Sequence, residues 1–323
     1  MRIMRLVPWL VCVCSLAPIA RAQQEGDKVV VVADRAALRS LEDTTGSVTK
    51  GAILLVRNVD GDWFWVYWSN GYKTVKGWIN RKDVVPYSRA LDFFDRELKR
   101  CPTATLYNQR GTLWNEKGEH DTAIGDYNEA IRLDPRVKDF YNNRGVAWDD
   151  KRDYEKAIAD YGRAIELDPK FSLAFNNRGN AWAALAEYDK AIADYSEAIR
   201  LDPKDASAFY NRAHAWSDQE AYGKAIPDYN EAIRLDPKDD AAYKNRGTAW
   251  SAKGQFDRAI GDFSRAIQFN PQSATAYLGR GNAWWAKSEY AKAISDYHEA
   301  IALGIRSLGP ERGRAATLRN RVS

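Results

Sequence analysis

The sequence predicts a mainly α-helical protein, a solenoid of helix–turn–helix repeats preceded by a small β-barrel. A block of 34 residues repeats six times through residues 104–307 without insertion or deletion. Prolines and tryptophans mark this period, at Pro135, Pro169, Pro203, Pro237 and Pro271 and at Trp114, Trp148, Trp182, Trp216, Trp250 and Trp284. A fixed period of this length is typical of units that bury a core only by stacking on their neighbours.

Each block predicts two antiparallel helices. In the fifth block, Tyr243, Gly247 and Trp250 share one face of a first helix because they are spaced four and three residues apart. A second apolar stripe, at residues 259–267, ends before Pro271, because proline cannot continue the helical hydrogen bonds. The tryptophans are therefore expected to be core residues.

Small residues recur where the two helices are expected to cross. Glycine costs a helix about 1 kcal/mol relative to alanine, yet it recurs at one position of the first helix. These glycines are Gly111, Gly145, Gly179, Gly247 and Gly281, and the second helices repeat alanines such as Ala123, Ala130, Ala157 and Ala164. Both columns predict a crossing too close for larger side chains.

These features resemble the tetratricopeptide repeat family over residues 104–307. The resemblance implies a superhelix whose first helices line a concave groove that binds a protein or peptide. The chain departs from the family at a position that usually holds leucine and here holds Arg110, Arg144, Arg178, Arg212, Arg246 and Arg280. An aspartate column accompanies it, at Asp126, Asp160, Asp194, Asp228, Asp262 and Asp296. We expect a ladder of partly buried Arg–Asp pairs, with solvated charges as the alternative.

Segments at both ends of the repeats have their own predictions. Residues 89–102 match the second helix of a repeat and predict a half-repeat capping helix. Residues 308–323 form a basic tail, expected to be loosely ordered or to close the last repeat with a short helix.

Residues 28–86 predict about five short strands. Two turn signals, Asp60-Gly61 and Asn70-Gly71, flank the aromatic segment 63–68. Together with the Leu38-Arg39 segment, Gly51–Val56, Gly77-Trp78-Ile79 and 83–85, these segments resemble a bacterial SH3-like β-barrel. The resemblance implies a module that binds peptides or peptidoglycan or that supports a neighbouring domain.

Alternation along the aromatic strand predicts a candidate SH3-like surface made of Trp63, Trp65 and Tyr67. Phe64, Val66 and Trp68 are then on the opposite side. A barrel this small buries only one side of the strand, so the first set is either available for stacking on a ligand or covered by the linker and the first helices.

The N-terminus predicts export. Arg2 and Arg5 precede an apolar run at residues 6–19, and Ala20-Arg21-Ala22 has the small-x-small pattern of a cleavage site. Residues 1–22 are therefore predicted to be a signal peptide, followed by a linker at 23–27, and the apolar run is too short for a membrane span. Cleavage near Ala22 gives a periplasmic or extracellular protein. Cys101 is then the one remaining cysteine, and a passive cap residue is favoured there over a reactive thiol.

The net charge argues against a nucleic-acid partner. The formal charge of the chain is +4. Arg2, Arg5 and Arg21 contribute three positive charges and the segment from Ile305 contributes four, so the body between them carries −3. A broad nucleic-acid surface needs clustered basic residues on the folded body.

The sequence predicts neither catalysis nor a cofactor nor a metal site. His120, His214 and His298 fall at unrelated positions of three repeats and show no metal-ligand spacing. No phosphate loop or nucleophile motif is present. The periodic carboxylates recur in every block, which is typical of structural or solvated positions.

A candidate peptide-binding groove follows from the resemblance, on the first-helix residues that point away from the second helices. It comprises Asn108, Asn142, Asn143, Asn176, Asn177, Asn180, Tyr210, Asn211, His214, Lys244, Asn245, Asn282 and Trp285. An amide both donates and accepts, so it pairs with an extended peptide backbone. The alternative for the asparagines is that they brace neighbouring helices. Acidic Glu116, Asp149 and Asp150 favour a neutral or mildly basic partner at the first repeats.

Two functions remain open at this point. The first is an exported, non-catalytic scaffold that binds a protein or peptide in the groove. The second is a cell-envelope module that binds peptidoglycan or another glycan through the SH3-like domain, with the repeats as recruiter.

Overall fold

The computed structural model describes residues 28–31, 35–39, 44–49, 53–60, 62–69 and 74–307. It divides into two compact units, Met1–Ala90 and Leu91–Ser323. The predictions for the signal peptide, the linker and the basic tail concern residues outside these ranges.

The first unit holds one antiparallel sheet of seven strands. They are β1 (Lys28–Val31), β2 (Arg35–Arg39), β3 (Thr44–Thr49), β4 (Ile53–Asp60), β5 (Trp63–Ser69), β6 (Thr74–Asn80) and β7 (Val84–Pro86). Their order is β3-β2-β6-β5-β4-β1-β7. The sequence predicted about five strands, marked only the Leu38-Arg39 end of β2, and missed β3, which lacks the apolar alternation that marks β5. The edge strands β3 and β7 do not pair with each other in the part of the chain that the structure describes, so the SH3-like barrel stays a prediction.

Strand β5 shows the predicted alternation. Phe64 and Val66 are fully buried in the core of the sheet, whereas Trp63 and Trp65 are only partly buried. The core also takes in Val29, Val31, Leu54, Val56, Ile79 and Val84. The side chains of Tyr67 and Trp68 lie outside the described residues.

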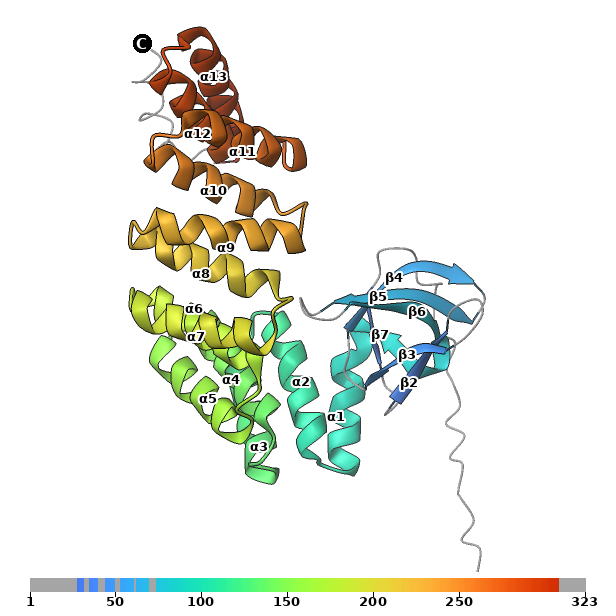
Figure 1. Ribbon diagram of the computed structural model, residues 1–323. Coiled ribbons are helices and arrows are strands. Elements are labelled where there is room, and N and C mark those ends of the chain that lie inside the picture. The colour runs from blue at the N-terminus through green and yellow to red at the C-terminus, as the bar shows by residue number, and fades with distance from the viewer. Residues whose placement is uncertain are drawn as a thin grey trace, which may run out of the picture. The chain divides into compact units, whose positions relative to one another are not determined.

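Helix α1 (Ala90–Arg100) starts at the last residue of the first unit and lies otherwise in the second, which continues with six helix pairs (Figure 1). The first helices are α2 (Ala104–Glu116), α4 (Lys138–Asp150), α6 (Ser172–Ala184), α8 (Ala206–Asp218), α10 (Asp240–Ala252) and α12 (Ala274–Ala286). The second helices are α3 (His120–Leu133), α5 (Tyr154–Leu167), α7 (Tyr188–Leu201), α9 (Tyr222–Leu235), α11 (Phe256–Phe269) and α13 (Tyr290–Ser307). The predicted helix pairs are confirmed, and each of the first five second helices ends just before an Asp-Pro or Asn-Pro pair.

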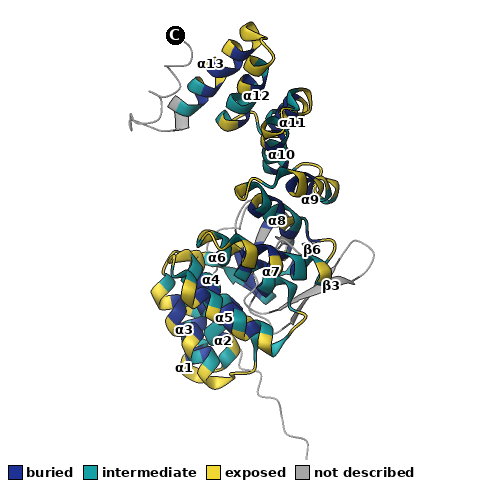
Figure 2. Ribbon diagram, turned by 60° about the vertical axis from the view of Figure 1, so that its left-hand side comes forward, coloured by how far each residue is buried: buried dark blue, intermediate teal, exposed yellow. Residues whose placement is uncertain are grey.

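The close crossing predicted from the glycine column is also present. A Cβ atom on Gly179 would lie 2.6 Å from the ring of Tyr195, and one on Gly145 would lie 2.7 Å from Tyr161. The alanine columns at these crossings are fully buried. Figure 2 shows the buried residues along the inside of the helix stack and the exposed ones at the turns.

The tryptophans are less buried than the sequence predicted. They are half-buried against the inter-repeat clusters, while the aromatic residues that are almost completely buried are Tyr127, Tyr161, Tyr195, Tyr229 and Phe263 on the second helices. A basic side chain covers the outer face of most tryptophans, as Lys190 does over Trp182 at 4.4 Å and Lys224 over Trp216 at 4.2 Å. The tryptophans therefore combine core packing with cation–π contacts near the surface.

The Arg–Asp ladder is confirmed in all six repeats. Each arginine donates through Nε and Nη2 to both oxygens of its aspartate at 2.6–2.8 Å. The aspartates are only 5–8% exposed. Hydrogen bonding to Asp126 raises the pKa of Arg110, as expected for a bidentate pair that fixes both charges. Each pair ties the first helix to the second helix of the same repeat.

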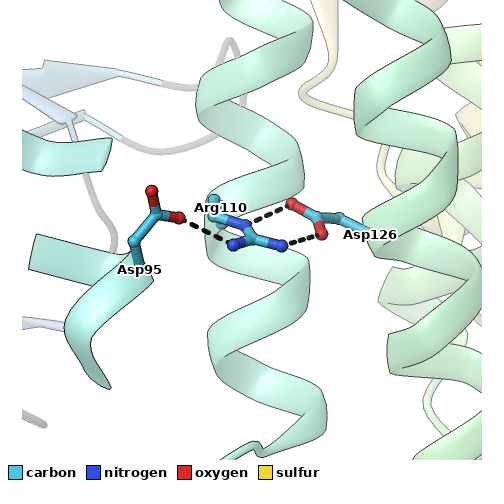
Figure 3. A network of polar contacts seen from close by, with 3 residues as sticks. All are labelled: Asp95, Arg110 and Asp126. Carbon is cyan, nitrogen blue, oxygen red and sulfur yellow. Dashed lines mark hydrogen bonds and ion pairs between the residues drawn. The ribbon is translucent and has the colours of Figure 1, made fainter. Parts of the chain in front are cut away.

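In five of the six repeats a third contact joins the arginine to the helix that precedes its own repeat. Arg110 Nη1 donates to Asp95 of α1 at 2.7 Å (Figure 3). Arg144 and Arg246 reach asparagines of the preceding second helix in the same way, and Arg212 and Arg280 reach serines. At Arg178 this acceptor is replaced by Gly162, whose added Cβ would lie 3.8 Å from Nη1.

We expect Gly162→Ser to stabilise the protein by restoring this contact. The serine oxygen would accept from Arg178 Nη1, as Ser196 and Ser264 do elsewhere. A hydrogen bond contributes about 0.5–1.5 kcal/mol beyond the helix-propensity gain of losing glycine. Urea unfolding measures both, and Gly125→Ser, where nothing lies near the added atom, is the control for propensity. Equal gains for the two variants would contradict the missing-acceptor explanation.

Candidate functional site

The predicted groove residues occupy one face of the six first helices, which we call the first-helix face. Successive first helices contact each other directly along the stack. Of the predicted residues, Asn180, His214, Asn282 and Trp285 are exposed, and Asn142 and Asn176 are buried. The half-buried residues are Asn108, Asn143, Asn177, Tyr210, Asn211, Lys244 and Asn245.

Most of the asparagines are joined in an amide ladder between repeats. Asn143 Nδ2 donates to Asn108 Oδ1 at 3.0 Å, and Asn177 donates to Asn142 at 3.1 Å. The ladder continues from Asn211 to Asn176 at 3.1 Å and from Asn245 to the hydroxyl of Tyr210 at 2.9 Å. Each bond links one first helix to the next.

The ladder bears on the two alternatives for the asparagine columns. Each contact uses one amide hydrogen and the oxygen of its neighbour. These side chains therefore brace neighbouring helices, which was the alternative to pairing with a peptide backbone. The next position in the series is Gly279, which carries no amide and whose added Cβ would meet Phe263 at 2.6 Å. The ladder therefore ends at the fifth repeat.

A separate row of exposed side chains, which includes Asn180 and Asn282, lies on the same first helices as the ladder. Buried tyrosines of the second helices fix the orientation of these two asparagines. Tyr195 donates its hydroxyl hydrogen to Asn180 Oδ1 at 2.8 Å, and Tyr297 donates to Asn282 Oδ1 at 3.0 Å. Burial raises the pKa of Tyr195, which keeps its hydroxyl protonated as a donor. Because the Asn180 oxygen is held inward, its Nδ2 hydrogens are directed away from the tyrosine.

The role of these tyrosines was not predicted from the sequence. Tyr127 makes the same kind of contact to Thr112 at 3.3 Å. Each of these tyrosines follows its partner on the first helix by 15 residues, and this constant offset is visible in the sequence. The offset alone does not show that the hydroxyl reaches across the helix pair.

His214 contacts a carboxylate on its own helix. Its Nδ1 lies 3.0 Å from Asp218 Oδ2, and its ring lies 6.3 Å from that of Tyr210. Both His214 and Asp218 are exposed. This pair places a polar, partly acidic patch in the middle of the first-helix face.

The first two repeats carry the acidic end of the face. Asp150 accepts from Asn115 Nδ2 at 2.8 Å, and His120 Nδ1 lies 2.8 Å from the oxygen of the same asparagine. Asp149 Oδ1 is buried without a hydrogen-bond partner among the described residues. Burial, together with the charge of Asp150, raises the pKa of Asp149.

Asp149→Asn is expected to stabilise the protein at neutral pH. The raised pKa means that the folded protein binds more protons than the unfolded chain above the ordinary value of 3.8. Stability from this group is therefore highest at acid pH and is lost as pH rises through the raised value. Thermal unfolding at pH 3 and pH 7 should show the variant gaining on the parent as pH rises. Asp153→Asn is the control, and it should lose stability relative to the parent as pH rises, because Lys156 lowers the pKa of Asp153. Asparagine keeps the helix cap that Asp153 provides. A gain that is equal at both pH values would contradict the assignment.

Aromatic residues gather at the end of the last repeat. Trp285 and Tyr290 are each 50% exposed, and their rings meet edge to face with centroids 4.8 Å apart. Trp285 lies outside the 34-residue tryptophan series, and the sequence placed it among the candidate groove residues.

The candidate SH3-like surface is only partly available. Trp63 and Trp65 are half-buried, and the Trp65 ring packs edge to face on Trp78 at 5.4 Å. Tyr67 has no described side chain.

The described residues hold neither a cluster of metal-ligating side chains nor a helix suited to cross a membrane. Within these residues no three or more His, Cys, Asp and Glu side chains are grouped so that they could hold a metal ion. None of the described helices has the length and apolar character that a membrane span requires.

The fold and the first-helix face define a protein built from stacked helical repeats. The profiles of the tetratricopeptide repeat match residues 139–171, 172–205, 206–239 and 244–307, together just over half of the chain. The chain belongs to the tetratricopeptide repeat family. No curated protein matches its sequence.

Solved structures share the repeat fold. PilW, a widely conserved type IV pilus biogenesis factor, superposes with a TM-score of 0.59 at 16% identity over 68% of this chain and 98% of its own. PilF of Pseudomonas aeruginosa gives a TM-score of 0.58 at 17% identity, over 68% and 97%. YrrB, a TPR protein with an unusual peptide-binding site, gives 0.50 at 23% identity, over 60% and 97%. At these identities the similarity shows the fold alone.

Proposed function

We propose that this protein is an exported, non-catalytic scaffold that binds an extended segment of a protein or peptide along the first-helix face. The observation that carries the proposal is the exposed row beside the amide ladder, where a buried tyrosine fixes the orientation of Asn180. An oriented amide donor suits a backbone carbonyl without selecting a side chain.

The ladder contributes rigidity to this proposal. Its contacts hold successive first helices at a fixed spacing, so the exposed row is organised before a partner arrives. Preorganisation of this kind reduces the entropy lost on binding. Asn108, Asn142, Asn143, Asn176, Asn177, Asn211 and Asn245 thus support the face, while Asn180, His214, Lys244 and Asn282 are the candidate contacts.

The partner and compartment follow from charge and from the N-terminal sequence. Asp149, Asp150 and Glu116 favour a neutral or mildly basic segment over the first repeats. The similarity in fold to YrrB, which has a peptide-binding site, and to pilus biogenesis factors is consistent with a binding role. Export rests on the predicted signal peptide at residues 1–22. The half-buried state of Trp63 and Trp65 gives no advantage to the glycan-binding alternative.

Asn180→Asp is the sharpest test of the proposal. Aspartate keeps the oxygen that accepts from Tyr195 but removes the amide donor. Random linear peptides displayed on phage and selected on the full-length protein supply the probe. Selected peptides should bind the variant about fivefold more weakly by calorimetry, which corresponds to one hydrogen bond of about 1 kcal/mol.

The control is Ser295→Ala, an exposed position on the second helix α13. It should leave peptide affinity unchanged. Peptides that bind Asn180→Asp and the parent equally, or a selection that returns no binding peptide, would overturn the proposed function.

A further inference from the structure

Two unpartnered polar groups lie in the second repeat. The Oδ1 atom of Asp149 is buried and accepts no hydrogen bond from the described residues. The Tyr161 side chain is only 1% exposed, and within the same part of the chain its hydroxyl has no hydrogen-bond partner either. Buried polar groups are normally hydrogen-bonded, and a ligand that pairs with both groups would remove the cost of leaving them unpaired.

The other repeats show why the Tyr161 hydroxyl lacks a partner. Tyr127, Tyr195 and Tyr297 each donate to the side chain 15 residues earlier. Fifteen residues before Tyr161 the chain has Val146, whose apolar side chain accepts no hydrogen bond. The hydroxyl is therefore left without the acceptor that its counterparts have.

Asp149 and the Tyr161 hydroxyl lie on the same side of the helix pair. In the fourth repeat the equivalent residues, Ser217 and Tyr229, have their side-chain oxygens 3.4 Å apart. The ring of Tyr161 crosses α4 at Gly145, where an added Cβ would lie 2.7 Å from it. Burial, together with the charge of Asp149, raises the pKa of Tyr161, as expected for neighbouring groups. Both groups therefore reach the same point of the first-helix face.

The charge at this point is negative and is not neutralised. Asp150 follows Asp149 directly, and among the described residues neither carboxylate forms an ion pair with a lysine or an arginine. Asp149 is the one carboxylate at its position of the six first helices, where the other repeats have Asn115, Ala183, Ser217, Ser251 and Trp285. A group that carries both positive charge and hydrogen-bond donors would complement the second repeat.

We propose that Asp149, Asp150 and Tyr161 form an anchor site for one basic side chain, a lysine or an arginine, of the bound segment. An ammonium or guanidinium group supplies donors both for Asp149 Oδ1 and for the hydroxyl oxygen of Tyr161. The apolar stem of the same side chain would lie along the half-buried Val146. The inference rests on the proposed function, because it names a residue type that the segment on the first-helix face must carry.

Charge-neutral peptide analogues test the anchor site on the full-length protein. The probes are peptides from the phage selection on that protein, with each lysine replaced in turn by acetyl-lysine and each arginine by citrulline. One replacement should weaken binding by at least about tenfold in calorimetry, the effect of losing a hydrogen bond to a charged group. On Asp149→Asn the same replacement should change affinity by less than about twofold, because the two changes remove the same interaction.

Glu155→Gln is the matched control. It removes one negative charge from an exposed position on α5, the second helix of the same repeat. Since this position is not on the first-helix face, the variant should keep the parent's difference between each peptide and its neutral analogue.

Three outcomes would overturn the anchor site while the proposed function stands. The selected peptides could carry no basic residue, or every neutral analogue could bind the parent as tightly as the original peptide. Asp149→Asn could also discriminate between the two peptides as the parent does, which would assign the basic side chain to another part of the protein. A selection that returns no binding peptide would instead overturn the proposed function itself, and the anchor site with it.

Discussion

Arg178→Leu is expected to destabilise the third repeat by about 3–5 kcal/mol. The substitution removes both donors to Asp194, which is 7% exposed and would be left as an unpaired charge inside the helix pair. Loss of one partner of a buried pair costs this much because water cannot replace the missing donor. Urea unfolding of the full chain measures the loss, and hydrogen exchange of α6 and α7 places it in that repeat.

Two further variants separate this explanation from a general effect of losing arginine. Arg163→Leu removes an exposed arginine that pairs with Glu166 and should leave the unfolding midpoint nearly unchanged. Replacing Arg178 and Asp194 together by leucine should restore most of the stability, since an apolar pair of similar volume leaves no buried charge. If the double variant were as unstable as Arg178→Leu, packing of the arginine rather than charge pairing would be the cause.

The Arg–Asp ladder also shows why some contacts were predictable from sequence. Two charged columns with one period have a constant offset, and the helix pairing follows from apolar spacing, so the Arg178–Asp194 contact follows from both. The glycine column is similar, because Gly179 leaves room for a single neighbour, Tyr195. The repeats supply six copies of the charged pair and five copies of the glycine.

Other contacts depended on geometry that a period does not contain. The amide ladder joins position five of one first helix to position six of the next, as in Asn142 and Asn177, and this requires the relative rotation of successive repeats. The half-buried state of the tryptophans depends on lysines such as Lys190, whose flexible side chains cover the ring. The strand β3 was missed because the first unit has no repeated copies in which a weak strand pattern would recur.

Pro227→Ala is expected to stabilise α9 by up to about 3 kcal/mol. The proline lies inside a helix that runs unbroken over Tyr222–Leu235 and removes the hydrogen bond from residue 227 to the carbonyl of Gly223. The ring of Pro227 is exposed, so alanine at this position restores the backbone hydrogen bond without disturbing a core contact. Thermal unfolding of the full chain should show a higher midpoint.

The matched control is Ala193→Pro, the same exposed position one repeat earlier in α7. It should lower stability by a similar amount, since proline there removes the bond to the carbonyl of Asp189. A loss at Ala193 without a gain at Pro227 would show that the neighbouring Gly223 lets α9 accommodate the ring without strain. If Pro227→Ala raises the unfolding midpoint as much as Ala193→Pro lowers it, the proline costs α9 its full penalty. The neighbouring repeats then hold α9 in the helical form, as expected when stability is shared between adjacent repeats.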